Sequence, residues 1–266
     1  MRVGFIGAGN MGGAILRGCL ASGQVLPTEV CVCGRSPEKL EALCQELGVQ
    51  SCGSIRELVE SSQVIMLGVK PNMFPEVLPQ VAEAYSSDKV LVSMAAGITM
   101  ASIGEGVSQS AKIIRVMPNT PAAVGEAMTS VSRNPQVNDE EFAEILELFQ
   151  SIGRAEEVKE ELIHCVIGVS GSSPAYTYMY IDALAEAAVK NGMEKEQALV
   201  FAAQSVLGAA KMVLETGVDP VQLRINVCSP GGTTIEAVER LQHLGFAEVV
   251  QSGFQAAVDK SRKMSR

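Results

Sequence analysis

The residues near the start of the chain that are best suited to chemistry are the glycines of Gly7–Gly12, which read Gly-Ala-Gly-Asn-Met-Gly. Their spacing matches GxGxxG, a pattern in which glycines allow a tight turn and a close approach of the backbone to a ligand. The apolar run Val3–Ile6 precedes the glycines, and helical spacing follows from Met11. A strand, a glycine turn and a helix in this order present free backbone amides that bind phosphate groups. We therefore predict a dinucleotide site at Gly7, Ala8, Gly9, Asn10, Met11 and Gly12.

The second expected strand, Val30–Cys33, is followed by Gly34, Arg35 and Ser36 and by no carboxylate. A carboxylate at this point, roughly 20 residues past the glycine loop, would bind the ribose hydroxyls of NAD. A guanidinium and a hydroxyl instead complement a 2′-phosphate, because arginine offers phosphate oxygens a planar, charged fork. Arg35 and Ser36 therefore favour NADPH, and NADH is the alternative. The alternative is that Arg35 is an ordinary surface residue at the start of the next helix.

Three further segments follow expected strands and are rich in glycine, proline or small residues: Val69–Pro71, Ala95–Gly97 and Met117–Pro121. In a doubly wound sheet the ligand lies beyond the carboxyl ends of the strands. We therefore add Val69, Lys70, Pro71, Ala96 and Gly97 to the predicted cofactor-binding residues. The alternative is that these prolines only end the strands.

A second glycine-rich segment, Cys228–Thr234, joins a glycine pair and two threonines to a helix expected over Ile235–Leu244. Such a helix start presents unpaired amides and the positive end of the helix dipole, which suit a carboxylate. Simple capping of the helix by serine or threonine is the alternative. We predict substrate binding by Ser229, Gly231, Gly232, Thr233 and Thr234.

The elements that carry these residues fall into two regions. Up to about residue 160, short apolar runs alternate with amphipathic helices, which is typical of a mostly parallel sheet covered on both faces. The expected strands are Val3–Ile6, Val30–Cys33, Val64–Val69, Val90–Met94, Ile113–Val116, Met128–Ser132 and a weaker one at Ala155–Val158. The expected helices are Met11–Ser22, Pro37–Leu47, Ile55–Ser61, Met73–Tyr85 and Asp139–Ser151. Asn138 and Glu141 have the spacing of a capping box for the last of these.

From about Leu162 the pattern predicts helices only, including Lys195–Glu215 and shorter helices after Pro220 and after Pro230. The sequence thus predicts an α/β Rossmann domain with a doubly wound, mostly parallel sheet over residues 1–160, and an all-α domain over residues 161–266. In the second domain, residues 198–210 are apolar on nearly all sides, and such a helix must be enclosed. We expect a second copy of the chain to enclose it. Packing against its own Rossmann domain is the alternative.

Composition excludes several classes of function. A net charge of −9 and the absence of tryptophan argue against nucleic-acid binding. Seven cysteines without a CxxC pair fit a reducing compartment, so we expect a cytoplasmic protein. The N-terminus lacks the pattern of a signal peptide, and the apolar stretch 197–210 is shorter than the roughly 20 residues that span a bilayer. We therefore expect no membrane partner.

Two charged stretches favour solvated surface. Nine carboxylates lie between Asp139 and Glu161, and we expect them on the exposed side of a surface helix. The basic residues Lys260, Arg262, Lys263 and Arg266 indicate a frayed, solvated tail. With only two histidines and no cysteines at metal-ligand spacing, we expect neither a metal site nor a histidine-based triad.

Six segments in order, covering nearly the whole chain, resemble Δ1-pyrroline-5-carboxylate reductase, the last enzyme of proline biosynthesis. They are GAGNMGGAI at 7–15, VKP at 69–71, AAGIT at 95–99, RVMPNTPA at 115–122, GVSGSSPAY at 168–176 and NVCSPGGTTIEA at 226–237. The resemblance implies hydride transfer from NADPH to the imine carbon of the substrate, giving L-proline. It also implies a homodimer through the helical domain, often assembled further into rings.

The resemblance further implies that backbone amides of Gly231 to Thr234 hold the substrate carboxylate. The Thr234 hydroxyl would lie near the ring nitrogen as the catalytic residue, and Asn226 would lie close to the cofactor. The chain departs from the family in two places. Many relatives have an acidic residue where this chain reads Leu223-Arg224-Ile225, and the family's usual glycine is Ser173 here.

Two other functions are open alternatives. A β-hydroxyacid dehydrogenase would match at Gly168 and Gly171, but its catalytic lysine position is Thr177 and its asparagine position is Ile181. Such an enzyme needs a base for the alcohol proton. A non-enzymatic nicotinamide sensor is compatible with the fold, although it would not require the glycine and hydroxyl segment Ser229–Thr234.

Overall fold

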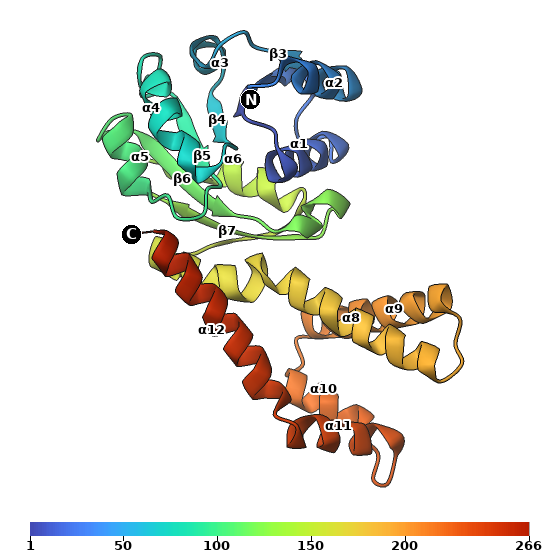
Figure 1. The fold of residues 1–266 in the computed structure, drawn as a ribbon. Coiled ribbons are helices and arrows are strands. Elements are labelled where there is room, and N and C mark those ends of the chain that lie inside the picture. Colours follow the sequence, from blue (N-terminus) through green and yellow to red (C-terminus); the bar gives the residue numbers. More distant parts are fainter. Residues whose placement is uncertain (266) are drawn as a thin grey trace. The chain divides into compact units, whose positions relative to one another are not determined.

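The computed structural model describes residues 1–265, which form two compact units (Figure 1). The sheet unit comprises residues 1–172 together with the chain from Ala257 onward, and the helical unit comprises Ser173–Ala256. These units divide the chain at other points than the expected limit near residue 160, because the segment after the last strand and the final helical turns pack on the sheet unit. The domain limits 1–160 and 161–266 stay a prediction.

The sheet unit is built on one eight-stranded sheet of order β3-β2-β1-β4-β5-β6-β7-β8. The strands are β1 Val3–Ile6, β2 Val30–Cys33, β3 Gln50–Ser51, β4 Val64–Leu67, β5 Val90–Ser93, β6 Lys112–Met117, β7 Ala127–Arg133 and β8 Gly153–Glu157. Strands β1 to β6 pair in parallel, β7 runs antiparallel to β6, and β8 is parallel to β7. The predicted α/β Rossmann class with a mostly parallel sheet is confirmed.

Helices cover both faces of this sheet, as its mostly apolar, fully buried strands β1, β4 and β5 require. The helices of the sheet unit are α1 Asn10–Ala21, α2 Pro37–Leu47, α3 Ile55–Ser61, α4 Phe74–Ala82, α5 Met100–Gly106, α6 Asp139–Gln150 and α7 Ile163–Val166; short 3₁₀ turns lie at Pro27–Glu29, Pro71–Met73, Thr120–Val124 and Glu160–Leu162, and a π-helical turn lies at Ile167–Gly171. One apolar cluster packs α1 and α6 against one face. A second cluster packs α3, α4 and α5 against the other.

The start of α6 shows how local sequence fixes these elements. Asn138 Oδ1 accepts a hydrogen bond from the Glu141 backbone N–H at 2.8 Å, and the Asn138 N–H donates to the Glu141 carboxylate at 3.2 Å. The predicted capping box is therefore confirmed.

Strand β3 and helix α5 were not predicted. The first has only two residues, and the second contains two glycines, so it depends on the Thr99 cap and on buried Ile103.

The helical unit contains α8 Ser173–Lys190, α9 Lys195–Thr216, α10 Pro220–Val227, α11 Thr233–His243 and the first part of α12 Phe246–Met264. Helices α8 and α9 pack through a small cluster of Ala185, Ala198 and Ala202. By length and composition α9 could cross a membrane, and only 11% of its most apolar window is buried within the chain. The uncharged stretch 197–210 ends at Lys211 as expected, but the whole helix around it is long and apolar enough, so the absence of a membrane partner stays a prediction.

The C-terminal basic residues that the structure describes are solvated as expected, but the expectation that they are frayed was wrong. Lys260, Arg262 and Lys263 lie in α12, where they are exposed, and Arg266 lies outside the described residues. The acidic stretch is mostly solvated as expected, with two exceptions. Glu141 pairs with Lys112, and Glu160 pairs with buried Arg115 at 2.9 Å.

Candidate functional site

The turn after β1 has a backbone that only glycine fits. Gly7 has φ +85°, and a Cβ placed on it would lie 2.9 Å from Val69 Cγ1. A Cβ on Gly12 would lie 2.9 Å from the Gly7 carbonyl oxygen, so α1 could not pack against the turn with a larger residue. The Gly7 N–H donates to the Cys33 carbonyl at 2.8 Å, which ties the turn to the end of β2.

The start of α1 leaves its amides free for a ligand. Its N-cap is Gly9, which makes no side-chain cap hydrogen bond, and no acidic residue lies in its first turn. A Cβ on Gly9 would meet no atom within 4 Å, so the glycine faces open space. The first amides of a helix have no partner within it and carry its positive dipole end. This start of α1 therefore fits a pyrophosphate.

A cavity of about 440 Å³ adjoins this turn at the carboxyl ends of β1, β2 and β4. It brings together four of the predicted residues, namely Gly7, Arg35, Val69 and Lys70. Two of these are cations, which suits a ligand with several phosphate groups. The predicted cofactor-binding residues of the sheet unit that lie outside its lining are Ala8, Gly9, Asn10, Met11, Gly12, Ser36, Pro71, Ala96 and Gly97.

Sequence reasoning missed several residues of this cavity: Gly53, Ser54, Ile55, Gly68, Met73, Glu76, Val77 and Gln80. Two carried a readable signal. Gly68 directly follows β4, and a Cβ on it would lie only 2.2 Å from the Gly7 carbonyl oxygen. Ser54 caps α3 by accepting a hydrogen bond from the Glu57 N–H at 3.1 Å, a position that marks the end of the β3 connection.

Two cysteines border this region and stay protonated. Burial raises the pKa of the Cys33 thiol, and neighbouring Cys31 and Glu57 raise it further. Burial is also the main cause that raises the pKa of Cys52 to about 12. At neutral pH neither thiol is a thiolate nucleophile. The chemistry of the cavity is therefore binding rather than covalent catalysis by these residues.

The predicted carboxylate site lies in the helical unit, at the start of α11. Gly231 has φ +68°, and the Gly232 N–H donates to the Ser229 carbonyl at 3.0 Å, which closes the turn. The N-cap of α11 is Gly232, and it makes no side-chain cap hydrogen bond. The alternative that serine or threonine caps this helix is therefore wrong. Thr233 and Thr234 are the first residues of the helix and are exposed in the single chain.

The predicted site residues are thus divided between the two units. Those from Gly7 to Gly97 belong to the sheet unit, whereas Asn226 and the five substrate-binding residues belong to the helical unit. Asn226 lies on α10, where its Oδ1 accepts a hydrogen bond from Gln222 Nε2 at 2.7 Å. Each unit therefore carries a helix that starts at an uncapped glycine.

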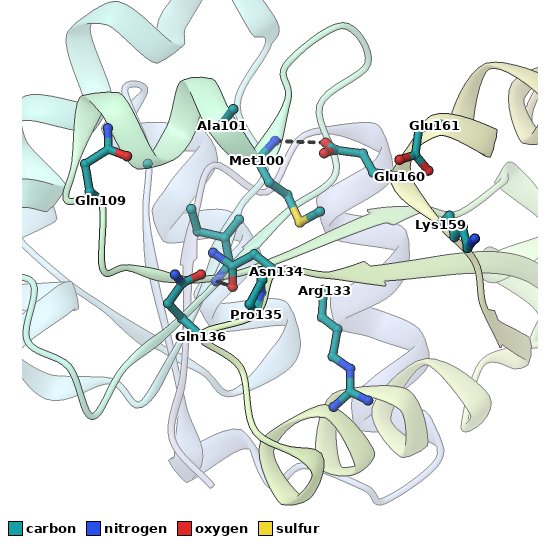
Figure 2. Close-up of a pocket in the computed structure, with 12 residues that line it drawn as sticks. Met100, Ala101, Gln109, Arg133, Asn134, Pro135, Gln136, Lys159, Glu160 and Glu161 are labelled. Atoms are coloured by element: carbon teal, nitrogen blue, oxygen red, sulfur yellow. Dashed lines mark hydrogen bonds between the residues drawn. The ribbon is translucent and has the colours of Figure 1, made fainter.

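A second cavity of the sheet unit, of about 610 Å³, lies between α5 and the segment after β8 (Figure 2). Three of its polar side chains, Arg133, Asn134 and Glu160, bond to other residues of the protein. Glu160 accepts from the Met100 N–H at 2.8 Å and from Arg115, and Asn134 bonds the backbone of Ile113 and Ala111. This cavity contains none of the predicted site residues, and we assign these three bonded side chains a structural role.

Two family models match the chain. Residues 2–97 match the NADP oxidoreductase, coenzyme F420-dependent family, and residues 160–264 match the pyrroline-5-carboxylate reductase dimerisation family. The chain therefore carries a dimerisation domain of that family, and the expected oligomer is supported.

Relatives cover the chain from end to end. A pyrroline-5-carboxylate reductase of Escherichia coli is 47% identical over 100% of this chain and 98% of the relative. One of Arabidopsis thaliana is 39% identical over 100% of this chain and 96% of the relative.

Solved structures agree. A pyrroline carboxylate reductase of Plasmodium falciparum with NADP bound superimposes with a TM-score of 0.91 at 30% identity, covering 100% of this chain and 98% of that one. A pyrroline-5-carboxylate reductase of Coxiella burnetii gives a TM-score of 0.92 at 33% identity, over 100% of this chain and 98% of that one. By its sequence, its domains and its fold, this chain belongs to the pyrroline-5-carboxylate reductase family.

Proposed function

We propose that the chain reduces Δ1-pyrroline-5-carboxylate to L-proline with NADPH. The observation that carries the proposal is the pair of uncapped, glycine-led helix starts, α1 beside a cavity with two cations and α11 in the helical unit. Each start offers free amides to an anion. One suits the pyrophosphate of a dinucleotide and the other the carboxylate of the substrate. Membership of the family adds independent support.

The cofactor is NADPH rather than NADH on the basis of Arg35. This residue is exposed and lines the cavity beside Gly7 and Lys70, and no carboxylate stands at the end of β2 to bind ribose hydroxyls. The guanidinium complements a 2′-phosphate. The relative from Plasmodium falciparum was solved with NADP bound, which agrees with this choice.

The reaction does not require the protein to supply a strong acid or base. The substrate is a cyclic imine with a carboxylate, and its protonated nitrogen makes the imine carbon electrophilic. When bound, the reduced nicotinamide supplies the hydride. The amides of Gly231 to Thr234 hold and orient the carboxylate, and the Thr234 hydroxyl stabilises the nitrogen as it becomes an amine. Neither role requires a strong base.

We also propose that the chain works as a cytoplasmic homodimer that neither inserts into a membrane nor binds nucleic acid. The exposed apolar surface of α9 is the surface that a second copy would cover, and the dimerisation model spans this helix. Assembly of dimers into rings, which the resemblance implies, is a further level of the same proposal. Sedimentation of the purified protein measures both levels.

One assay tests the activity. Purified protein is mixed with NADPH, and absorbance at the nicotinamide band is followed before and after pyrroline-5-carboxylate is added. We expect oxidation only after the addition, with proline as the product. Binding of NADPH without oxidation would support the sensor instead. Reduction of NADP⁺ by a β-hydroxyacid, with no reaction of the imine, would support the hydroxyacid dehydrogenase.

A further inference from the structure

The last turn of α12 contacts the loop after β5. A Cβ placed on Gly97 would lie 2.8 Å from the carbonyl oxygen of Met264 and 3.2 Å from its carbonyl carbon. These are backbone atoms, which cannot move aside as a flexible side chain can. Gly97 also has φ +83°. The glycine is therefore required by its own backbone and by the approach of the C-terminal turn.

This turn is anchored on the sheet unit by more than one contact. Ser261 is buried, and its Oγ lies 2.9 Å from His164 Nδ1 on α7. Val258, one turn earlier, is also buried. The Ser265 Oγ donates to the Ser261 carbonyl at 3.2 Å, so the residue after the helix is tied back to this turn. The last turn of α12 is a docked part of the sheet unit.

The loop that it contacts lies at the ligand edge of the sheet. Strand β5 is the parallel neighbour of β4, whose end at Gly68 packs against the Gly7 turn. The loop Ala95–Gly97 leaves β5 at the same carboxyl edge, and buried Ala95 donates its N–H to Ser93 Oγ at 3.4 Å. Ligands of open α/β sheets bind beyond this edge. The position of the loop therefore bears on how a dinucleotide can bind.

We propose that residues 261–265, which comprise the last turn of α12 and the residue after it, are a positioning element that fixes the Ala95–Gly97 loop for binding of the nicotinamide cofactor. The proposal rests on the proposed function, since it assumes that this loop contributes to the NADPH site. The turn acts through its contact with Gly97. We do not assign it any contact with the reacting atoms. It gives the C-terminal residues of this chain a role in cofactor affinity.

The first test is a chain truncated after Arg262, which lacks Met264 but keeps Ser261 and Val258. We expect the KM and Kd for NADPH to rise roughly two- to thirtyfold, the range typical of positioning residues, while kcat at saturating NADPH changes less than KM. A truncated protein with the KM and Kd of the full chain would overturn the proposal. A full-length Ser261→Ala protein should show a smaller rise in the same direction, and it decides the matter if the truncated chain does not fold.

The second test is Gly97→Ala in the full and truncated chains. In the full chain the new methyl group meets the Met264 carbonyl, whereas in the truncated chain only the strain of the positive φ remains. We therefore expect the loss of NADPH affinity on substitution to be larger in the full chain. An equal loss of NADPH affinity in the full and the truncated chain would mean that the contact with Met264 does not affect cofactor binding. Gly23→Ala is the matched control, because Gly23 has φ +74° and open space around its Cβ position.

These outcomes are separable from those of the proposed function. NADPH affinity is measured by fluorescence titration, which needs no turnover. If the unmodified protein binds NADPH but does not reduce pyrroline-5-carboxylate, the proposed function fails while the binding data still decide the role of the turn. If the protein reduces the imine and the truncation has no effect on affinity, only the role of the turn fails.

Discussion

The sheet unit and the helical unit bury their apolar residues to very different degrees. In the sheet unit, two clusters enclose large side chains such as Phe5, Leu67 and Phe149. In the helical unit, the cluster of buried residues consists of three alanines, while Val200 and Phe201 on α9 are 66% and 59% exposed. The sheet unit completes its own core. The helical unit leaves apolar surface exposed, which fits the dimerisation family that its residues match.

The largest loss of stability is expected at the ion pair inside the sheet unit, and it tests whether that unit encloses its own core. The Arg115 side chain is 3% exposed, and the Glu160 carboxylate is its ion-pair partner at 2.9 Å. Glu160→Ala leaves a buried guanidinium uncompensated, which we expect to cost about 3–5 kcal/mol of unfolding free energy. Urea unfolding measures this cost.

The exposed pair Arg56–Glu60 is the matched control, because its side chains are 64% and 55% exposed. Glu60→Ala should change stability by less than about 1 kcal/mol. Similar losses for Glu60→Ala and Glu160→Ala would mean that the sheet unit does not seal Arg115 as the structure shows.

The next effect concerns the open surface of the helical unit. Phe201→Asp places a charge on the apolar side of α9, and we expect it to weaken self-association by about 2–4 kcal/mol while the monomer stays folded. Sedimentation across a range of concentrations measures the association. Leu26→Asp, at an exposed apolar residue of the sheet unit, should leave it unchanged. Dissociation by both variants, or by neither, would break the contrast between the units.

Arg35→Ala tests the ligand edge of the sheet unit. Loss of a charge-assisted contact to the 2′-phosphate should weaken NADPH by roughly 1.5–3 kcal/mol, or about ten- to a hundredfold, and NADH far less. Titration with each cofactor gives both affinities, and NADH serves as the internal control. Equal weakening of the two would remove Arg35 from the 2′-phosphate site.

Thr234→Ala tests the helical unit in the same way. We expect kcat/KM for pyrroline-5-carboxylate to fall roughly five- to a hundredfold, corresponding to about 1–3 kcal/mol, with kcat reduced and NADPH affinity nearly unchanged. The melting temperature should hardly change, because the cap of α11 is Gly232 and not a threonine. A destabilised variant with normal kcat/KM would show that the role of Thr234 is structural.

The smallest effect is a pH dependence at His164, where α12 is anchored on the sheet unit. Burial, and then the charges of Arg115 and Arg262, lower the pKa of His164. The unfolded chain therefore binds this proton more readily than the folded chain. The proton does not lower the unfolding free energy above the ordinary pKa of about 6.5, and it lowers it as the pH falls from there through the reduced pKa of the folded state. His164→Asn should flatten the fall in unfolding free energy between about pH 7.5 and about pH 5.5. His243→Asn, at the exposed end of α11, should leave that slope intact.

Local patterns were sufficient to predict most of the sheet unit. The apolar runs at Val3–Ile6 and Val30–Cys33 match β1 and β2 residue for residue, and the glycine turn lies where GxGxxG placed it. Elements held by distant contacts were not predictable. The role of Glu160 depends on Arg115, forty-five residues earlier in the chain, so its carboxylate had the appearance of one more surface charge. The end of α12 was missed for the same reason, since its basic residues are exposed while the buried residues Val258 and Ser261 pack it on the sheet unit.

The cavity residues divide in the same way. Gly7, Arg35, Val69 and Lys70 were readable because they follow strands directly. Met73, Glu76 and Gln80 reach the cavity from the segment after β4, and only the packing of α4 on the sheet brings them there. Sequence alone does not give that packing.

The exposed apolar surface of α9 has a consequence for the life of a newly made chain. Until it meets a second copy, the chain presents a helix of 22 residues that is hydrophobic enough to pass for a membrane span. The time that a chain spends as a monomer depends on how often two chains collide, so it shortens as the concentration of the protein rises. At low expression, chaperones and proteases compete with assembly for the same surface. The abundance of the working protein should then rise more steeply than its rate of synthesis.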